Sequence, residues 1–204
     1  MKVGILAVQG DFEAHAATLA RLGVEYVFVR TPADMHDVDA VILPGGESTT
    51  QWKFLAEEGL DKALLTHAAK GGAFFGTCAG AILLATEVEN PPQAGLGALN
   101  IRIRRNAYGR QIDSSIREGK LLSDLANNPA GSPLEMVFIR APKIERIGEG
   151  VEVLATEGSD PVAVRQGRAM AATFHPELSE DTRVHQAFLN LVKNRKALIT
   201  DDQF

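Results

Sequence analysis

The feature that most constrains this chain is the alternation of short apolar runs with helical patterns in its first half. The apolar runs predict strands and stop at glycine, proline or polar residues; they cover residues 2–9, 25–29, 40–43 and 73–76. Between them, apolar residues recur at helical spacing in three segments: Phe12 to Leu19, 61–70 and 79–85. Short apolar strands separated by helices predict an α/β fold with a mostly parallel central sheet and helices on both faces.

The second half of the chain predicts extra strands. Apolar runs separated by turn residues cover residues 98–104, 136–139, 151–156, 161–165 and 170–174. The segment 126–133, rich in Asn, Pro, Gly and Ser, predicts a long surface loop. A final helix is expected because one helical face carries Val184, Ala187, Phe188, Leu191 and Val192. No repeat or linker divides the sequence, so residues 1–204 are expected to form a single domain.

Composition argues against several classes of protein. The 204 residues include one cysteine, Cys78, which excludes a disulfide within the chain and a zinc site of several thiolates. A net charge of −5 argues against nonspecific nucleic-acid binding. No apolar run approaches the ~20 residues of a membrane span, and the N-terminal run is too short for a signal peptide. We therefore expect a cytoplasmic protein without a membrane or nucleic-acid partner.

The lone cysteine lies in the string Gly76-Thr77-Cys78-Ala79-Gly80, between a predicted strand and a predicted helix. This pattern is typical of a nucleophile elbow, with cysteine in place of serine. The tight turn presents the nucleophile, and the flanking glycines let neighbouring backbone pass close by. The backbone N–H of Ala79 would then point to where an oxyanion forms. The alternative is an inert, buried cysteine beside glycines that serve packing alone.

A cysteine nucleophile needs a base, and His175 is the best candidate among five histidines. It ends a predicted strand and precedes Pro176, which favours extended backbone, so His175 and Glu177 are expected to point the same way. The carboxylate can then orient the imidazole. The alternative is a strand-ending turn with an incidental His and Glu. The other four histidines are expected at the surface or at helix ends: His15, His36, His67 and His185.

A third motif, Pro44-Gly45-Gly46-Glu47-Ser48, follows the third predicted strand. Ligands gather at the carboxyl ends of parallel strands, so this loop is expected beside Cys78. Two successive glycines let backbone N–H groups turn inward and complete an oxyanion hole begun by Ala79. Ser48 or Thr49 can equally be the N-cap of a following helix. A phosphate-binding loop is less well supported, because no Gly-Lys-Ser/Thr follows.

Taken in order, three strings resemble the class I, or triad, glutamine amidotransferases: residues 43–48, 76–80 and 174–177. Three others resemble the glutaminase subunits of pyridoxal 5′-phosphate synthase: Val8-Gln9-Gly10-Asp11, Arg105-Asn106-Ala107-Tyr108-Gly109-Arg110-Gln111 and Phe138-Ile139-Arg140-Ala141-Pro142. The resemblance runs from residue 2 to about residue 192. It implies a flavodoxin-like amidotransferase fold. The chain departs from the family pattern at Ser115-Ile116, where the family usually has Phe-Glu.

The resemblance implies hydrolysis of L-glutamine to L-glutamate and ammonia through a thioester. Cys78 would be the nucleophile, His175 the general base and acid, and Glu177 the orienting carboxylate. Backbone N–H groups of Gly46 and Ala79 would form the oxyanion hole. The matching glutamine-binding positions are Gly46, Glu47, Ser48, Arg105, Ile139 and Arg140. Arg105 suits an amino-acid ligand because guanidinium pairs well with carboxylate, although a solvated arginine is the alternative.

The resemblance also implies a partner. Ammonia would pass to a (β/α)8-barrel synthase subunit in a hetero-oligomer that makes pyridoxal 5′-phosphate. Gln9-Gly10 would lie near the active site, where the glutaminase of this family is linked to docking of the synthase. Neither a cofactor nor a metal is expected in this chain. Three other functions stay open: a triad amidotransferase with another ammonia acceptor, a non-catalytic subunit of the same fold, and a cysteine hydrolase of a related fold. The strings 106–111 and 138–142 argue against another ammonia acceptor. The intact triad argues against a non-catalytic subunit, and the His-Pro-Glu arrangement argues against a cysteine hydrolase of a related fold.

Overall fold

The computed structural model describes residues 1–107, 114–122, 126 and 128–201, and the side chains of these up to residue 194. Its larger sheet begins with five neighbouring parallel strands: β2 (Glu25–Val29), β1 (Lys2–Leu6), β3 (Ala40–Leu43), β4 (Ala73–Thr77) and β12 (Ala169–Ala172). Four antiparallel strands continue it: β11 (Asp160–Gln166), β10 (Glu152–Glu157), β7 (Ser115–Leu121) and β8 (Pro133–Phe138). The predicted α/β fold with extra strands in the second half is confirmed.

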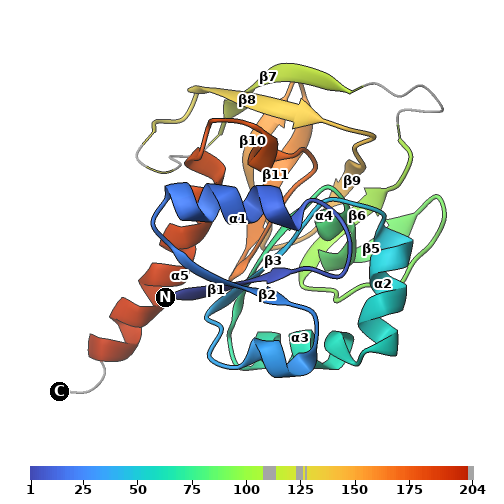
Figure 1. Cartoon of the computed structure of the whole chain (residues 1–204). Coiled ribbons are helices and arrows are strands. Elements are labelled where there is room, and N and C mark those ends of the chain that lie inside the picture. Colours follow the sequence, from blue (N-terminus) through green and yellow to red (C-terminus); the bar gives the residue numbers. More distant parts are fainter. Residues whose placement is uncertain (108–113, 123–125, 127, 202–204) are drawn as a thin grey trace.

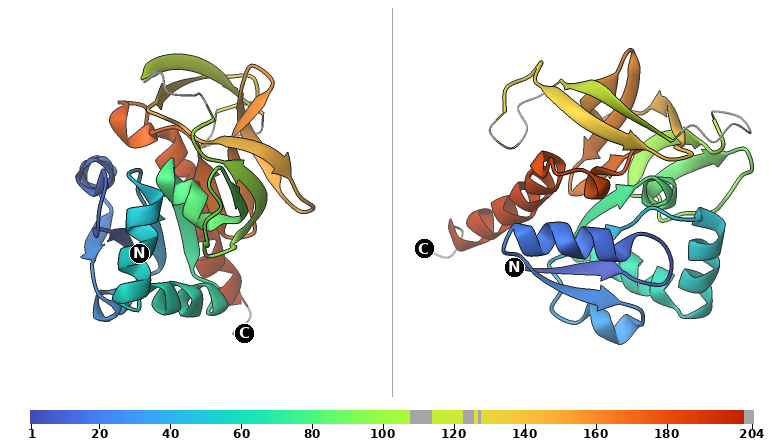
Figure 2. Two further views of the ribbon diagram at one scale, coloured as in Figure 1. Left: turned by 90° about the vertical axis from the view of Figure 1, so that its right-hand side faces the viewer. Right: turned by 45° about the horizontal axis from the view of Figure 1, so that its top comes forward.

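A smaller sheet lies beside the larger one. It consists of β5 (Ala85–Glu89), β6 (Leu99–Arg104) and β9 (Lys143–Ile147). Figure 2 shows from two sides that β7 and β8 lie at one end of the molecule, far from β2. The predicted loop 126–133 joins β7 to β8, although residue 127 lies outside the described residues.

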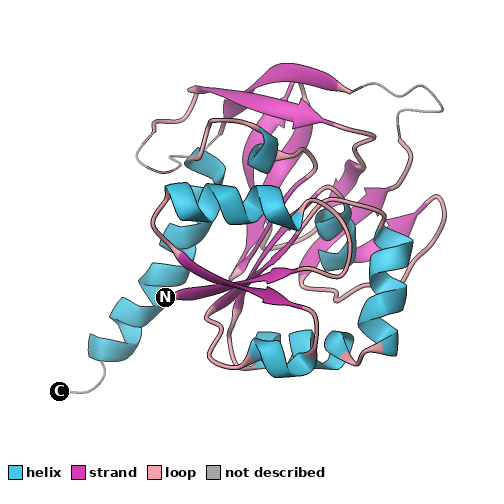
Figure 3. Ribbon diagram, viewed as in Figure 1, coloured by secondary structure: helices cyan, strands magenta, loops and turns pink. Residues whose placement is uncertain are grey.

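Helices cover both faces of the parallel strands (Figures 1 and 3). One face carries α1 (Phe12–Arg21) and α5 (Arg183–Asp201), whose Leu19 and Phe188 pack in one core with Ile5 and Phe75. The other carries α2 (Ser48–Glu57), α3 (Leu60–Ala69) and α4 (Ala79–Leu84). Two short 3₁₀ helices, η1 (Pro32–Met35) and η2 (Pro176–Leu178), complete the described elements. None of the described helices is long and apolar enough to cross a membrane.

Five described elements were not predicted, β5, β7, β9 and the two 3₁₀ helices, and α2 was expected only through a possible N-cap. The buried face of α2 is largely polar, since Ser48 and Gln51 lie there beside Leu55, so its apolar period is weak. The three strands carry charged residues and alternate buried with exposed positions only in part. The alternative that Ser48 or Thr49 is the N-cap of this helix is wrong. Glu47 is the N-cap, and its carboxylate accepts hydrogen bonds from the N–H groups of Thr49 and Thr50.

The carboxyl ends of four adjacent strands, β1, β3, β4 and β12, meet at one edge of the sheet. The loops that follow them carry Gln9-Gly10-Asp11, Gly45-Gly46, Cys78 and the His175–Glu177 turn. The backbone segments at this edge pass very close to one another. A Cβ added at Gly80 would lie 1.9 Å from the carbonyl oxygen of Leu43, so only glycine lets α4 pass the end of β3. This edge gathers the three motifs found in the sequence.

Substituting Gly80 tests this close approach. We expect Gly80→Ala to lower the free energy of unfolding by about 3 kcal/mol or more, because backbone must move to admit the methyl group. Gly158→Asn, at the β10–β11 turn, is the control: nothing lies within 4 Å of its added Cβ, and asparagine tolerates a positive φ. Urea unfolding measures both variants. Equal, small losses in the two would contradict the packing described for Gly80.

Candidate active site

Cys78 occupies the sharp turn between β4 and α4. Its φ of +46° lies in the region that side chains rarely adopt. The turn is held by a hydrogen bond from the Cys78 N–H to the carbonyl of Ala172, at 2.9 Å. The Cys78 Sγ lies 3.8 Å from the carbonyl oxygen of Ile139. Strained backbone of this kind persists only where its surroundings hold it, and here it presents the thiol at the carboxyl edge of the sheet.

His175 and Glu177 form a buried pair beside this turn. The Nδ1 of His175 lies 2.8 Å from the Oε1 of Glu177. The N–H of His175 donates to the carbonyl of Val137 at 2.8 Å, which fixes the turn to β8. The two side chains meet because the chain enters η2 at Pro176, rather than through the extended backbone that the sequence suggested. The predicted pairing of this His and Glu is present, with a different local geometry.

The pKa values of both members of this pair are strongly shifted. Burial alone would lower the pKa of His175, but the adjacent Cys78 and Glu177 outweigh it and raise the pKa to about 10. Burial alone would raise the pKa of Glu177, yet His15 and His175 lower it to about 2. The Nε2 of His175 is buried and makes no hydrogen bond of standard geometry to the described residues. This nitrogen is therefore the ring atom left for the Cys78 thiol.

A small cavity of about 140 Å³ lies over Cys78. Nine of the ten predicted site residues line it: Gly46, Glu47, Ser48, Cys78, Ala79, Arg105, Ile139, Arg140 and His175. The tenth, Glu177, lies behind His175 and contacts its ring. Four lining residues were absent from the predicted set: Asp11, Ile82, Asn106 and Pro142. Asp11, Asn106 and Pro142 belong to the three strings that resemble the glutaminase subunits. The string 105–111 is only partly described, because residues 108–113 lie outside the described residues.

The Gly45-Gly46 loop forms one wall of this cavity. A Cβ added at Gly45 would lie 2.3 Å from the Cε1 of His175, so the imidazole requires glycine there. Gly46 has a φ of +151°, and its added Cβ would lie 2.5 Å from the Oε1 of Gln9. That oxygen accepts the N–H of Glu47 at 2.9 Å. Gln9 thus lies beside the loop, as the sequence predicted.

Arg105 and Glu47 face each other across the cavity mouth. The Nη2 of Arg105 donates to the Oε1 of Glu47 at 3.1 Å and to the hydroxyl of Thr49 at 2.8 Å. Although partial burial opposes it, hydrogen bonds from Thr50 and Thr49 lower the pKa of Glu47 to about 2. The guanidinium therefore has a carboxylate partner from the protein and is not merely solvated.

Two of the four remaining histidines contradict the sequence prediction. His15 on α1 and His185 on α5 are fully buried behind Glu177, whereas His36 is exposed and His67 is half-buried in the last turn of α3. The Nε2 of His15 lies 3.1 Å from the Oγ1 of Thr77. Helical spacing could have revealed them, since each lies four residues before a leucine of the buried face, Leu19 and Leu189.

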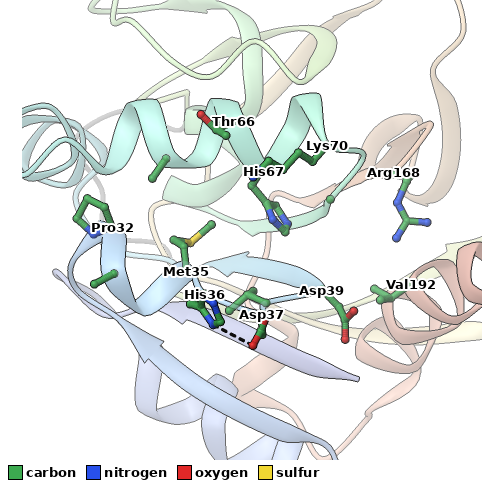
Figure 4. A pocket seen from close by; sticks show the side chains of 14 residues that line it. Pro32, Met35, His36, Asp37, Asp39, Thr66, His67, Lys70, Arg168 and Val192 are labelled. Atoms are coloured by element: carbon green, nitrogen blue, oxygen red, sulfur yellow. Dashed lines mark ion pairs between the residues drawn. The ribbon is translucent and has the colours of Figure 1, made fainter.

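Two other features resemble binding sites. Among the described residues, one group could hold a metal ion: Asp11, His175 and Glu177 offer ligand atoms within 4.8 Å of one another. The latter two already bind each other, so the group is held together without an ion. A larger cavity of about 600 Å³ lies near the amino ends of β3 and β4, lined by residues such as Asp39, His67 and Arg168 (Figure 4). It contains none of the predicted site residues.

The raised pKa of His175 can be tested at Glu177. Glu177→Gln removes the carboxylate bound to Nδ1, so we expect the pKa of His175 to fall from about 10 towards its ordinary value. Glu180→Gln is the matched control, because that nearby carboxylate is 97% exposed. NMR titration of labelled histidine rings measures both. A His175 titration that stays the same in Glu177→Gln would contradict the assigned cause.

Comparison with known proteins identifies the family. A model of the SNO glutamine amidotransferase family matches residues 5–194. The pyridoxal 5′-phosphate synthase subunit PdxT of Koribacter versatilis is 53% identical over 194 residues, 95% of this chain and 97% of the relative. The PdxT of Deinococcus radiodurans is 49% identical over 200 residues, covering 96% and 99%.

Solved structures agree. One described as a glutamine amidotransferase is 46% identical, with a TM-score of 0.86 over 94% of this chain and 98% of that one. The PurLQS structure from Thermotoga maritima shares the fold alone, with 18% identity and a TM-score of 0.74 over 93% of this chain and 97% of that one. The match over residues 5–194 and these identities show that the chain belongs to the SNO glutamine amidotransferase family.

Proposed function

We propose that this chain is the glutaminase subunit of a pyridoxal 5′-phosphate synthase. It hydrolyses L-glutamine to L-glutamate and ammonia, and the ammonia goes to the synthase subunit. The observation that carries the proposal is the Cys78 elbow beside the His175–Glu177 pair, at a cavity lined by the other predicted glutamine-binding residues. Relatives at 53% and 50% identity that bear the PdxT name support the choice of synthase.

Cys78 is the proposed nucleophile and His175 its base. The Nε2 of His175 takes the thiol proton, and the thiolate attacks the side-chain amide carbon of glutamine. The raised pKa of His175 supports this step, because an imidazolium beside a thiolate is the favoured form of such a pair. Glu177 holds the ring through Nδ1, so that Nε2 is the atom directed at the sulfur.

The tetrahedral intermediate carries an oxyanion. We assign its stabilisation to the backbone N–H groups of Gly46 and Ala79, both of which line the cavity; one such donor is typically worth ~10²–10³ in rate. His175 then returns its proton to the amide nitrogen, the carbon–nitrogen bond breaks, and ammonia leaves a thioester on Cys78. Water, deprotonated by His175, attacks the thioester and the carbon–sulfur bond breaks. Glutamate is released, and His175 returns the proton to the Cys78 thiolate.

The cavity also suggests how glutamine is held. Arg105 is the proposed partner of the glutamine carboxylate, in exchange for its contact with Glu47. Glu47, Ser48, Ile139 and Arg140 line the remaining walls. The departure at Ser115-Ile116 lies in β7 and does not line the cavity, so it does not affect these contacts.

The remaining proposals concern the setting of the reaction. We propose one amidotransferase domain over residues 1–204, because a continuous sheet joins strands from both halves of the chain. The partner is proposed to be a (β/α)8-barrel synthase subunit in a hetero-oligomer. A cytoplasmic location is proposed because the thiol of Cys78 must stay reduced to act.

The assignment of the nucleophile predicts the effect of Cys78→Ala. We expect release of glutamate from glutamine to fall by at least about 10³-fold, while binding to the synthase subunit is retained. Glutamate is measured with and without a pyridoxal 5′-phosphate synthase subunit, and binding by size-exclusion chromatography. Appreciable hydrolysis by the variant would refute the mechanism. Stimulation of the wild type only by a different synthase would select another ammonia acceptor.

The role of Arg105 predicts a separate effect. Arg105→Ala should raise the KM for glutamine about 10- to 100-fold, with a smaller change in kcat, because a hydrogen bond to a charged group is worth about 1.5–3 kcal/mol. Arg102→Ala is the matched control: Arg102 pairs with Glu87 and Glu89 on β5 and does not line the cavity. If both variants shift KM equally, Arg105 does not bind the carboxylate.

A further inference from the structure

Two buried histidines, His15 and His185, have no part in the mechanism above. They come from α1 and α5, the two helices on one face of the sheet, and both side chains are fully buried. The Nδ1 of His15 lies 2.9 Å from the Nε2 of His185. On its other side, the Nε2 of His15 lies 3.1 Å from the Oγ1 of Thr77 and 3.5 Å from the Oε1 of Glu177. The imidazole pair thus ends on the carboxylate that holds His175.

The direction of these hydrogen bonds follows from protonation. Burial lowers the pKa of His15 and lowers that of His185 to about 3, so both rings are neutral and each carries one N–H. The Nδ1 of His185 is buried without a hydrogen-bond partner among the described residues. An orphaned N–H is rarer than an orphaned lone pair, so we assign the His185 proton to Nε2, where it donates to His15. The proton of His15 is then on Nε2.

That N–H completes the bonding of Thr77. A threonine hydroxyl has one proton to donate and two lone pairs. The Oγ1 of Thr77 accepts the N–H of Gly45 at 3.1 Å and the Nε2–H of His15 at 3.1 Å, and donates to the Oε1 of Glu177 at 3.3 Å. The same Oε1 accepts from the Nδ1 of His175. One directed chain of hydrogen bonds therefore runs from His185 through His15 and Thr77 to the Glu177 carboxylate, which also accepts from His175.

We propose that His15, fixed in one tautomer by His185, is a positioning residue for the hydrolysis of glutamine. Its Nε2–H donates to the Thr77 hydroxyl, and that hydroxyl donates to the Glu177 carboxylate and holds it ionised and directed at His175. The proposal deepens the proposed function and rests on it. A purely structural role is less favoured, because Phe75 lies edge-on to both rings and the surrounding core is apolar. Apolar side chains would fill this space without a buried polar pair.

The pH dependence of the site has a limited set of contributors. Among the described residues, the titratable and charged groups that face Glu177, or its partners, from the packed elements are His15, His175, Cys78, Asp11, His185 and Arg21. The Oδ2 of Asp11 lies 3.6 Å from the Nδ1 of His175 and supplies a second, more exposed carboxylate. Of this set, His175 and His15 both lie close to the Oε1 of Glu177, at 2.8 and 3.5 Å. Loss of His15 and of its hydrogen bond to Thr77 leaves the carboxylate easier to protonate and to rotate.

The test compares His15→Leu with His15→Gln in the complex with the synthase subunit. Leucine removes the donor. The glutamine amide can place an N–H near the position of Nε2. We expect His15→Leu to lower kcat about 10- to 100-fold with little change in KM, and to move the acidic limb of the pH profile upward. His15→Gln should recover most of both effects. His36→Leu, at an exposed histidine, is the matched control.

A second measurement does not depend on glutamine hydrolysis. Cys78 is the only thiol of the chain, so iodoacetamide alkylation followed by mass spectrometry reports on this site alone. We expect the pH at which alkylation accelerates to rise in His15→Leu, because a weakened Glu177 supports the imidazolium of His175 less. If the wild type fails to hydrolyse glutamine under all conditions, the proposed function fails, while alkylation still tests His15.

The outcomes separate positioning from simple stability. Wild-type kcat and unchanged pH profiles in a folded His15→Leu overturn the proposal. So does a loss of kcat with an unmoved acidic limb and no recovery in His15→Gln. If His15→Leu does not fold, His185→Leu takes its place, since it frees the tautomer of His15. An upward shift of the acidic limb in that variant supports the proposal, and an unmoved limb overturns it.

Discussion

The fold is organised around one buried charge, the carboxylate of Glu177. A carboxylate removed from water is stable as an anion only when hydrogen-bond donors surround it. Here two donors reach its Oε1 from different elements, His175 from the turn after β12 and Thr77 from β4, and His15 from α1 donates in turn to Thr77. Helix α5 acts one step further out through His185. Helices α1 and α5 therefore contact the active site through hydrogen bonds, in addition to packing in the core.

The two parts of the larger sheet contribute differently to the cavity. Its parallel strands end in the loops that carry Cys78, the glycine loop and His175. The antiparallel extension and the smaller sheet supply the outer wall, through Ile139 after β8 and Arg105 after β6. The two parts are joined at the site itself, because the carbonyl of Val137 on β8 accepts the N–H of His175. The extra strands therefore complete the cavity.

The sequence predicts the parts of this fold where one physical signal dominates. Strands β1, β3 and β4 are apolar because both of their faces are covered, and the elbow and the His-Pro-Glu string have few alternative meanings. Strands such as β7 were missed because Arg117, Glu118 and Lys120 interrupt its apolar pattern. His15 and His185 were missed for the opposite reason. A histidine suggests a surface position, and only the three-dimensional arrangement places Glu177 beside them.

The shared hydroxyl of Thr77 has a consequence for how the site assembles. It is bonded both to Gly45, in the loop that borders the oxyanion position, and to Glu177, behind the base. A displacement of the loop therefore strains the hydrogen bond from Thr77 to Glu177, which aligns His175. A displacement of Glu177 likewise strains the hydrogen bond from Gly45 to Thr77. Half-formed sites with one component in place are disfavoured by this arrangement. The oxyanion loop and the base are thus expected to reach their working positions together.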